Sequence, residues 1–248
     1  MKKGILKKRA DTLVVEQGLA TSREQARALI MAGKVFCRDH RVEKAASPLP
    51  RDVRLHLAQA RRFVSRGGMK MEHALRHFSM NVQKMVVLDV GASAGGFTHC
   101  LLEYGATRVY ALDVGYGQID YRLRQDSRVV VMERVNARHP FHLPDEVDCI
   151  TVDVSFISLT KVLPSVVKHL RAGGHIMALV KPQFEAGPND VGRHGVVRDP
   201  RVHAAVIGRV CLWCIGHGWR LHGITASPIL GNAGNREFFV LFHVYHLT

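Results

Sequence analysis

The sequence predicts an α/β fold in which a mostly parallel sheet with an antiparallel last strand follows a small α+β domain. From Val86 onward, five apolar runs alternate with helical stretches, a pattern typical of a parallel sheet covered by helices on both faces. A glycine-rich loop, Gly91 to Gly96, joins the first run to a helix. The last two apolar runs are joined without a helical pattern, so we expect the final strand to reverse direction.

The first 60 residues are expected to form the small domain. Within this domain, glycines mark the ends of the expected helices, and a hydroxyl side chain caps the start of the second one. A basic linker over residues 61–68 ends in paired glycines and is expected to lead into the large domain, residues 69–248. The elements expected in the small domain are a helix from Ala10 to Gln17 ended by Gly18, a helix from Arg23 to Ile30 capped by Thr21 or Ser22 and ended by Gly33, and strands from Lys34 to Cys37 and Val53 to Leu57.

Basic residues are concentrated in this small domain. The chain carries 35 Lys and Arg against 21 Asp and Glu, a net charge of +14. Residues 1–62 contain 15 Lys and Arg and 6 Asp and Glu, a surplus of 9 positive charges, whereas the remaining residues have a surplus of only 5. Such a concentration predicts a polyanionic partner, either nucleic acid or an anionic membrane surface. The expected phosphate-binding face comprises Arg9, Arg23, Arg27, Lys34 and Arg38, extended through the linker by Arg61, Arg62 and Arg66.

The large domain is expected to contain seven strands. Helical stretches lie between most of the first five strands, which predicts a parallel sheet with helices on both faces. A long apolar tract from Val202 to Trp219, interrupted by Arg209 and His217, is expected to be a buried or half-buried helix. The expected strands are Val86 to Val90, Val109 to Val114, Val129 to Val131, Cys149 to Val154, Ile176 to Val180, Leu221 to Ile224 and Phe238 to Val244.

Composition excludes several classes of protein. Apolar residues make up 47% and charged residues 23% of the chain, which is ordinary for a globular protein and not for a disordered one. No run of about 18 apolar residues exists, so we expect no stable membrane insertion. Five cysteines, an odd number, and the lack of an apolar stretch after Met1-Lys2-Lys3 lead us to expect a cytoplasmic protein without disulfides.

The glycine-rich loop indicates a nucleoside-containing ligand. Gly91 allows a sharp turn, and Gly95 and Gly96 allow close backbone approach. The next strand ends at Asp113, whose carboxylate can accept hydrogen bonds from both hydroxyls of a ribose. Asp89, at the end of the first strand, is expected near a positively charged part of the ligand. The glycine spacing matches the dinucleotide pattern G-x-G-x-x-G poorly, which disfavours a nicotinamide cofactor.

Four charged residues are expected to meet at the carboxyl edge of the sheet, where ligands of open parallel sheets bind. Asp153 and Lys181 end strands, Glu237 begins the last strand, and Lys70 lies in the segment leading into the first strand. A lysine can act as a base when burial and a neighbouring cation depress its pKa. Two lysines with two orienting carboxylates therefore suit the deprotonation of a poor nucleophile such as a ribose hydroxyl.

Several long motifs resemble the TlyA family of rRNA 2′-O-methyltransferases, which are often labelled hemolysins. The resemblance covers nearly the whole chain. The large domain resembles the FtsJ type of RNA ribose methyltransferase, and the first domain resembles the RNA-binding motif of ribosomal protein S-four. The motifs that carry the resemblance are "RADTLVVEQGLATSREQARALIMAGKV", "SRGGMKMEHAL", "LDVGASAGGFTHCLL", "ALDVGYGQ", "DVSFISL", "LVKPQFEAG" and "GNREF".

The resemblance implies a Rossmann-like methyltransferase sheet, S-adenosylmethionine as cofactor and methylation of a cytidine ribose in ribosomal RNA or ribosomal subunits. It implies that Lys70, Asp153, Lys181 and Glu237 form the catalytic tetrad. The cofactor contacts it implies, together with those expected above, are Asp89, Gly91, Ala92, Ser93, Gly95, Gly96, Phe97, Asp113, Asn136 and Asp153. No metal is expected.

Three other patterns in the sequence allow alternative sites. The G-x-S-x-G pattern around Ser93 allows a hydrolase nucleophile, although that leaves Asp113 and the lysines without roles. The C-x-x-C of Cys211 and Cys214 lies in an apolar helical tract and is expected to be buried core. His73 and His77 are one helical turn apart and are expected on a solvated helix face, since a metal site needs further ligands.

Two other function classes remain open at this point. One is an RNA-binding ribosome-assembly factor with a vestigial methyltransferase fold, which would not bind the cofactor. The other is a membrane-lytic hemolysin, which the absence of a long basic amphipathic helix disfavours.

Overall fold

The computed structural model describes residues 6–38, 40–57, 62–231 and 233–245. The chain divides into two compact units, residues 1–61 and residues 62–248. Each unit has its own hydrophobic core.

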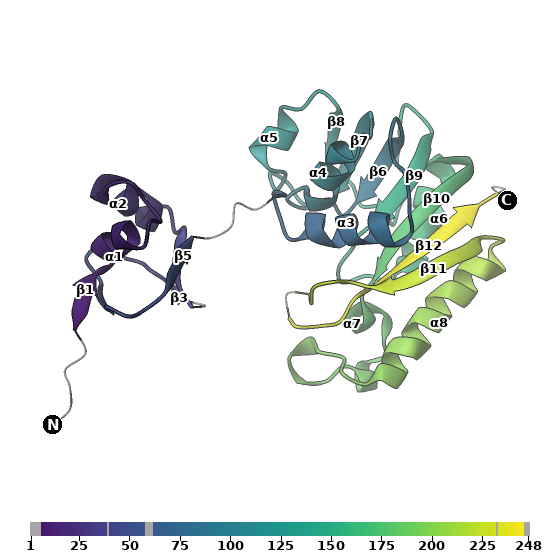
Figure 1. Ribbon diagram of the computed structural model, residues 1–248. Coiled ribbons are helices and arrows are strands. Elements are labelled where there is room, and N and C mark those ends of the chain that lie inside the picture. The colour runs from purple at the N-terminus through teal and green to yellow at the C-terminus, as the bar shows by residue number, and fades with distance from the viewer. Residues whose placement is uncertain (1–5, 39, 58–61, 232, 246–248) are drawn as a thin grey trace. The chain divides into compact units, whose positions relative to one another are not determined.

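The small unit combines two helices with short strands (Figure 1). Both expected helices form, and Ser22 rather than Thr21 caps the second, because its hydroxyl accepts the backbone N–H of Gln25 at 3.1 Å. Leu13, Val14 and Ile30 form the centre of its core. The strands pair as β1 with β4 and in the order β3-β2-β5. The elements are β1 (Lys7–Arg9), α1 (Ala10–Glu16), α2 (Arg23–Met31), β2 (Val35–Cys37), β3 (His40–Arg41), β4 (Pro48–Pro50) and β5 (Leu55–Leu57).

The segment expected to be a linker differs from that prediction over its described part, residues 62–68. Phe63 is only 2% exposed and belongs to a core cluster of the large unit. The paired glycines open helix α3 (Gly67–His77). A Cβ on Gly68 would lie 2.2 Å from the Phe63 ring, so the packing of Phe63 requires glycine at this position.

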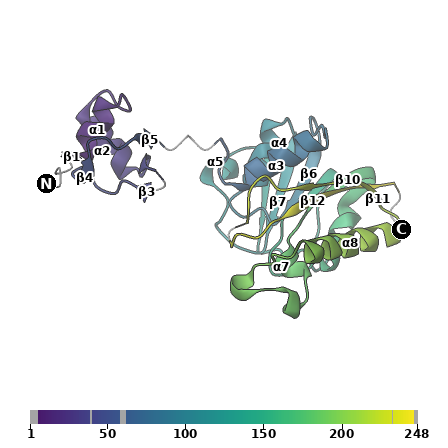
Figure 2. The same cartoon turned by 60° about the horizontal axis from the view of Figure 1, so that its bottom comes forward.

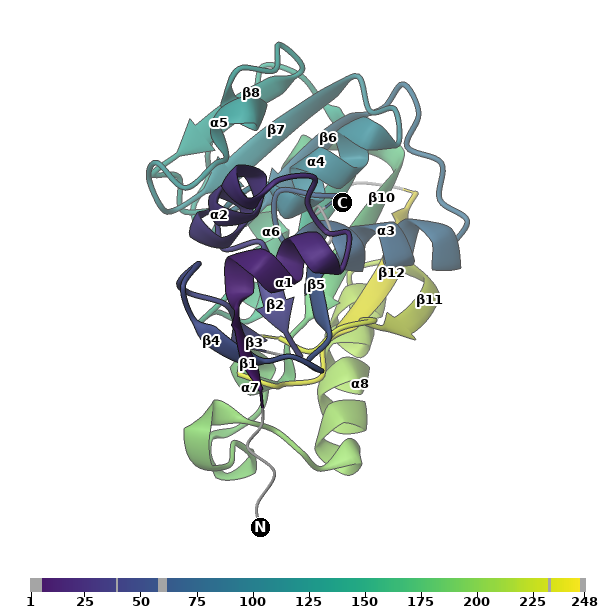
Figure 3. The same ribbon diagram turned by 60° about the vertical axis from the view of Figure 1, so that its left-hand side comes forward.

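The large unit is built on a seven-stranded sheet in the order β11-β12-β10-β9-β6-β7-β8. Strands β6 to β10 run parallel to one another, and β12 runs antiparallel to both β10 and β11. The antiparallel last strand is as predicted. Figure 3 shows the β6, β7 and β8 side of this sheet. The strands are β6 (Val86–Val90), β7 (Arg108–Asp113), β8 (Val129–Glu133), β9 (Val147–Val152), β10 (Leu170–Val180), β11 (Arg220–Ala226) and β12 (Phe238–Val244).

Helices cover both faces of the sheet. Figure 2 shows α3 and α4 on one side of it and α7 and α8 on the other. Alternate residues of β10 divide between the two core clusters, with Ile176 in one and Met177 in the other, as period-two alternation requires. The helices are α4 (Gly96–Glu103), α5 (Tyr121–Arg124), α6 (Leu163–Val166), α7 (Pro182–Glu185) and α8 (Pro200–Gly216), with short 3₁₀ turns at Leu159–Lys161, Val167–His169, Pro188–Asp190 and Arg193–Gly195.

Helix α8 contains the C-x-x-C pair. Cys211 is 5% exposed and Cys214 is fully buried, both within the core cluster on that face of the sheet. Burial raises the pKa of the Cys214 thiol, and a protonated buried thiol is unreactive. The prediction of two core cysteines is confirmed.

Candidate active site

The site lies where the chain order of the sheet reverses. Strands β6 and β9 are neighbours, but the chain continues from β6 to β7 on one side and from β9 to β10 on the other. Open α/β sheets bind ligands at this switch point, beyond the carboxyl ends of the strands. Gly91 follows β6 with φ +84°, and a Cβ there would lie 2.4 Å from the carbonyl oxygen of Asp153. Only glycine therefore lets the two strand ends approach this closely.

A cavity of about 560 Å³ opens at this edge, a size typical of small-ligand sites. One wall is formed by the glycine-rich loop, including Gly91, Ala92, Ser93, Gly96 and Phe97. Lys70, Asp153, Lys181 and Glu237 line the same cavity. The structure therefore brings the four residues of the expected tetrad together with most of the expected cofactor loop.

Lys70 and Glu237 form the first of two ion pairs in the cavity. Lys70 Nζ lies 2.5 Å from Oε2 of Glu237, and the two residues are 8% and 3% exposed. Lys70 projects from α3, whereas Glu237 immediately precedes β12. Because β12 runs antiparallel to β10, its first residues lie at the carboxyl edge of the parallel strands. A buried charge of this kind requires its partner, since removing either one leaves the other uncompensated.

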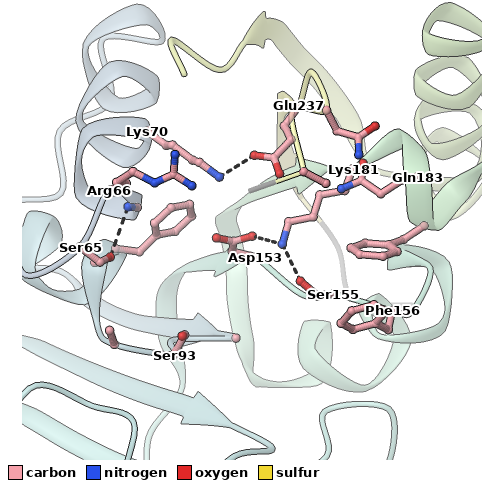
Figure 4. A pocket seen from close by; sticks show the side chains of 18 of the residues that line it. Ser65, Arg66, Lys70, Ser93, Asp153, Ser155, Phe156, Lys181, Gln183 and Glu237 are labelled. Carbon is pink, nitrogen blue, oxygen red and sulfur yellow. Dashed lines mark hydrogen bonds and ion pairs between the residues drawn. The ribbon is translucent and has the colours of Figure 1, made fainter. Parts of the chain in front are cut away.

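Lys181 and Asp153 form the second ion pair (Figure 4). Lys181 Nζ lies 2.7 Å from Oδ1 of Asp153, with the geometry of an ion pair rather than a hydrogen bond. It also donates a hydrogen bond to Ser155 Oγ at 2.9 Å. In Figure 4 the two carboxylates lie between the two lysines. The amine of Lys181 is thus held in place by two oxygens beside the glycine-rich loop.

Asp113 ends β7 and is held by backbone donors. Its two carboxylate oxygens accept the N–H groups of Ser93, at 2.8 Å, and of Gly115, at 2.7 Å. A carboxylate can accept about four hydrogen bonds, so capacity remains for ribose hydroxyls. These contacts also tie the glycine-rich loop to the end of β7.

The expectation that Asp89 contacts a ligand is wrong. Its side chain is fully buried, and its two oxygens accept hydrogen bonds from Thr98 Oγ1 at 2.7 Å and Thr151 Oγ1 at 2.9 Å. Burial raises the pKa of Asp89 to about 6 against the opposing effect of those bonds. Asp89 therefore crosslinks β6 to α4 and β9 beneath the loop instead of reaching the cavity.

Gly95, Asp113 and Asn136 lie outside the cavity lining. Gly95 is buried, and a Cβ there would lie 2.3 Å from a Leu123 methyl group. Asn136 follows β8, is exposed, and accepts the backbone N–H of Arg138. Gly95 therefore serves packing of the loop, whereas cofactor contacts by Asp113 and Asn136 stay predictions.

Two aromatic residues in the cavity wall were not anticipated. Phe156 is 90% exposed and has a φ of +63°, and its ring lies 4.8 Å from that of Phe184. Non-glycine residues with positive φ are uncommon and concentrate at functional sites. Ser93, with φ +49°, and His194, with φ +64°, line the same cavity. The motif "DVSFISL" placed Phe156 after a strand, but no sequence signal indicated that its ring would be exposed.

The expected phosphate-binding residues fall into different settings. Arg9, Arg23 and Arg27 all contact the carboxylate of Asp11, while Lys34 and Arg38 are exposed. In the large unit, Arg62 pairs with Glu72, and Arg66 lines the cavity. Arg61 lies outside the described residues. Part of the expected phosphate-binding face is therefore an ion-pair network around Asp11. Counting charges along the sequence could not reveal this network.

The hydrolase alternative lacks its general base. Ser93 Oγ donates to Oε1 of Gln118 at 3.2 Å, and no hydrogen bond from Ser93 to a histidine occurs in the described part of the chain.

His73, expected on a solvated face, is half-buried, contacts Thr225 Oγ1 at 3.2 Å and stacks on the exposed ring of His77. Over the ranges that the structure describes, none of the helices is both long and apolar enough to cross a membrane.

Comparison with known proteins assigns families to both units. The model of FtsJ-like methyltransferases matches residues 63–244, and the S4 domain model matches residues 8–55. The 16S/23S rRNA (cytidine-2′-O)-methyltransferase TlyA of Mycobacterium tuberculosis is 44% identical, over 94% of this chain and 88% of that protein. Hemolysin A of Brachyspira hyodysenteriae is 39% identical, over 94% of this chain and 99% of its own length. A solved structure from Streptococcus thermophilus, described as a candidate hemolysin, is 40% identical with a TM-score of 0.74, covering 97% of this chain and 90% of that one.

Proposed function

Because the chain belongs to the FtsJ-like methyltransferase family, we propose that it transfers a methyl group from S-adenosylmethionine to a ribose 2′-hydroxyl, that of a cytidine, in ribosomal RNA. The observation that carries this proposal is the pair of Lys–carboxylate contacts, Lys70 with Glu237 and Lys181 with Asp153, on the same cavity as the glycine-rich loop. The TlyA relative is named as an rRNA (cytidine-2′-O)-methyltransferase, which supports a cytidine ribose in rRNA as the methyl acceptor.

The cavity fits a nucleoside cofactor with an amino-acid end. The loop from Gly91 to Gly96 gives a backbone surface without large side chains at the strand switch point, and Asp113 is oriented by two N–H groups at the edge of that loop. These residues would hold S-adenosylmethionine, with Asp113 accepting hydrogen bonds from the ribose. When bound, the cofactor supplies a methyl group on a sulfonium whose leaving thioether is neutral.

The protein's own task is to orient and deprotonate the acceptor. The un-ionised amine of Lys181 takes the proton of the 2′-hydroxyl as the oxygen forms its bond to the methyl carbon, because an un-ionised hydroxyl is a poor nucleophile. The ammonium that results is the cation that pairs with Asp153. Asp153 and Ser155 fix the position of that amine, at 2.7 and 2.9 Å. The buried Lys70–Glu237 pair forms the opposite side of the cavity and orients the acceptor. Alignment and proton transfer account for most of the rate enhancement expected from such a site.

The aromatic pair fits an unpaired nucleobase. Enzymes that modify RNA at a single nucleotide work on splayed bases, which stack on aromatic side chains. Phe156 presents an exposed ring beside Ser155 and Lys181, backed by Phe184. A base stacked on Phe156 would place its attached ribose within the cavity. This supports a nucleotide acceptor over a small free substrate.

A methyl-transfer assay with a matched lysine variant tests the proposal. Wild-type protein, Lys181→Met and Lys161→Met are incubated with labelled S-adenosylmethionine and unmodified ribosomal subunits. Lys161 is an exposed lysine in the 3₁₀ turn Leu159–Lys161. We expect Lys181→Met to lower the rate by at least about 100-fold, the usual contribution of a general base, and Lys161→Met to leave it unchanged. Cofactor affinity by calorimetry should be retained in both. A fully active Lys181→Met would contradict the proposed base.

A further inference from the structure

A single buried carboxylate in the small unit contacts three arginines. Asp11 lies in the first turn of α1 and is fully buried. Arg9 approaches it bidentately, with Nε at 3.1 Å from Oδ1 and Nη2 at 2.8 Å from Oδ2. From α2, Arg23 Nη2 and Arg27 Nε each lie 3.3 Å from Oδ2. The hydroxyl of Thr12 adds a longer contact to Oδ1, at 3.4 Å.

Three cations exceed what neutralising one carboxylate requires. A buried carboxylate is tolerated when it is paired and hydrogen-bonded, and the bidentate contact from Arg9 already supplies both. The hydrogen bond from Arg9, followed by those from Arg27 and Arg23, holds the pKa of Asp11 well below its usual range. With Asp11 ionised, the cluster of four side chains carries a net charge of +2. The second and third arginines therefore need another explanation.

The three guanidinium groups keep donors that Asp11 does not use. A guanidinium has five N–H donors in a planar fork. Arg9 uses two nitrogens on Asp11, and Arg23 and Arg27 use one each. Their side chains remain 45%, 54% and 56% exposed, whereas that of Asp11 is 0% exposed. The carboxylate is thus hidden beneath three solvent-accessible cations from two separate elements of the chain.

We propose that Asp11 is a positioning residue, which gathers Arg9, Arg23 and Arg27 into one preorganised site for the phosphate groups of RNA. This rests on the proposed function in taking RNA as the partner. Free arginine side chains lose substantial rotamer freedom when they bind. Arginines already fixed by a shared carboxylate have lost much of that freedom before RNA arrives, so more of the binding energy appears as affinity.

This proposal and simple electrostatics predict opposite signs. The negative charge of Asp11 repels phosphates, so its removal alone should strengthen RNA binding and steepen the salt dependence, because more counterions would be released. If Asp11 positions the arginines, its removal should weaken binding even though the net charge becomes more positive. The sign of one affinity change therefore separates the two readings.

The test measures binding of the full chain to a labelled, unmodified 23S rRNA transcript over a range of salt concentrations. We expect Asp11→Asn to weaken binding about tenfold, equivalent to about 1.4 kcal/mol. Unchanged or tighter binding would overturn the proposal. Methyl transfer is not the readout, so a chain that binds the transcript but fails to methylate ribosomal subunits would refute the proposed function and leave this inference standing.

A double-mutant cycle shows whether Asp11 acts through the arginines. Arg27→Gln, at a side chain that is 56% exposed, should weaken binding several-fold in the wild-type background and much less in the Asp11→Asn background. Lys34→Gln is the matched control, because Lys34 is exposed in the same unit and is not among the described contacts of Asp11. It should have the same effect in both backgrounds. Equal effects of Arg27→Gln in both would contradict the proposal.

A variant that keeps Asp11 guards against loss of folding. Should Asp11→Asn fail to fold, Arg23→Gln and Arg27→Gln are combined in the wild-type background instead. Both side chains are more than half exposed, so the core is left intact. One shared site predicts that the double variant loses less affinity than the product of the single losses, by at least about threefold. Independent, multiplicative losses would refute the shared site.

Discussion

Replacing Gly91 by alanine should damage both the fold and the cofactor site. Gly91 combines a φ of +84° with a hypothetical Cβ only 2.4 Å from the carbonyl oxygen of Asp153. That oxygen belongs to the backbone after β9 and cannot rotate away as a flexible side chain would. The methyl group must therefore push apart the ends of β6 and β9, at the point where the glycine-rich loop begins.

The size of the effect follows from two contributions. Holding alanine in left-handed backbone costs about 1–2 kcal/mol, and forcing a methyl group into a filled space costs about 1–3 kcal/mol more. Gly218 isolates the first contribution, because its φ is +80° and a Cβ there would meet nothing within 4 Å. Gly218→Ala should thus lower the free energy of unfolding by about 1–2 kcal/mol, and Gly91→Ala by about 2–5 kcal/mol.

Denaturant unfolding and calorimetry with S-adenosylmethionine provide the assay. We expect Gly91→Ala to weaken cofactor binding by at least about tenfold, which corresponds to about 1.4 kcal/mol, because the loop is displaced. Gly218→Ala should leave that affinity unchanged. Equal losses of stability in the two variants, or normal cofactor affinity in Gly91→Ala, would refute the argument that close approach at the switch point requires glycine.

Three further predictions concern buried acidity, stacking and the position of Glu237. Because the pKa of Asp89 is raised from 3.8 to about 6, its contribution to stability is present below pH 4 and lost as the pH rises through 6. The unfolding free energy of Asp89→Asn should therefore rise by about 2 kcal/mol relative to that of the wild type between pH 4 and pH 7, and a pH-independent difference between the two would contradict this. Phe156→Ala should lower kcat/KM for RNA by about tenfold or more, as expected for loss of base stacking, with melting temperature and cofactor affinity preserved; an unaffected kcat/KM would argue against stacking. Gly231→Ala would place a Cβ 2.4 Å from Oε1 of Glu237, and the displaced carboxylate should disturb its contact with Lys70 and lower the rate of methyl transfer by at least about tenfold. Gly216→Ala is the control, because a Cβ there has nothing within 4 Å, and it should leave the rate unchanged. Equal rates in the two variants would show that Glu237 can shift without consequence.

The sheet was predictable from the sequence because its strands are long and buried. Val86 to Val90 and Phe238 to Val244 match β6 and β12 in their bounds, since each run is apolar except for one residue, Asp89 in the first and His243 in the second. The antiparallel last strand followed from a connection without a helix. The strands β1, β3 and β4 were missed, because two or three residues are too few for an alternating pattern and the sequences of these strands, KKR, HR and PLP, contain at most one apolar side chain besides proline.

The site was only partly predictable. Lys70, Asp153, Lys181 and Glu237 could be placed at one edge because each lies at an element end, and the fold fixes where those ends meet. Their pairing, Lys70 with Glu237 and Lys181 with Asp153, depends on side-chain packing.

The same limit explains the errors elsewhere. Asp89 was misplaced because a strand-end carboxylate in the sequence does not reveal that two threonine hydroxyls bury it. The paired glycines were assigned to a linker, but they begin helix α3, and Gly68 packs against Phe63. Aspartate and glycine can each play several roles, and in both cases contacts with residues distant in the sequence determined which role applies.

The identity of the product nucleoside tests the central claim most directly. Ribosomal subunits are incubated with the protein and S-adenosylmethionine, and the RNA is digested to nucleosides and examined by mass spectrometry. We predict a cytidine methylated on its ribose 2′-oxygen, absent when Lys181→Met replaces the wild-type protein. A methyl group on the base, or no methylated nucleoside from protein that binds the cofactor, would contradict the account.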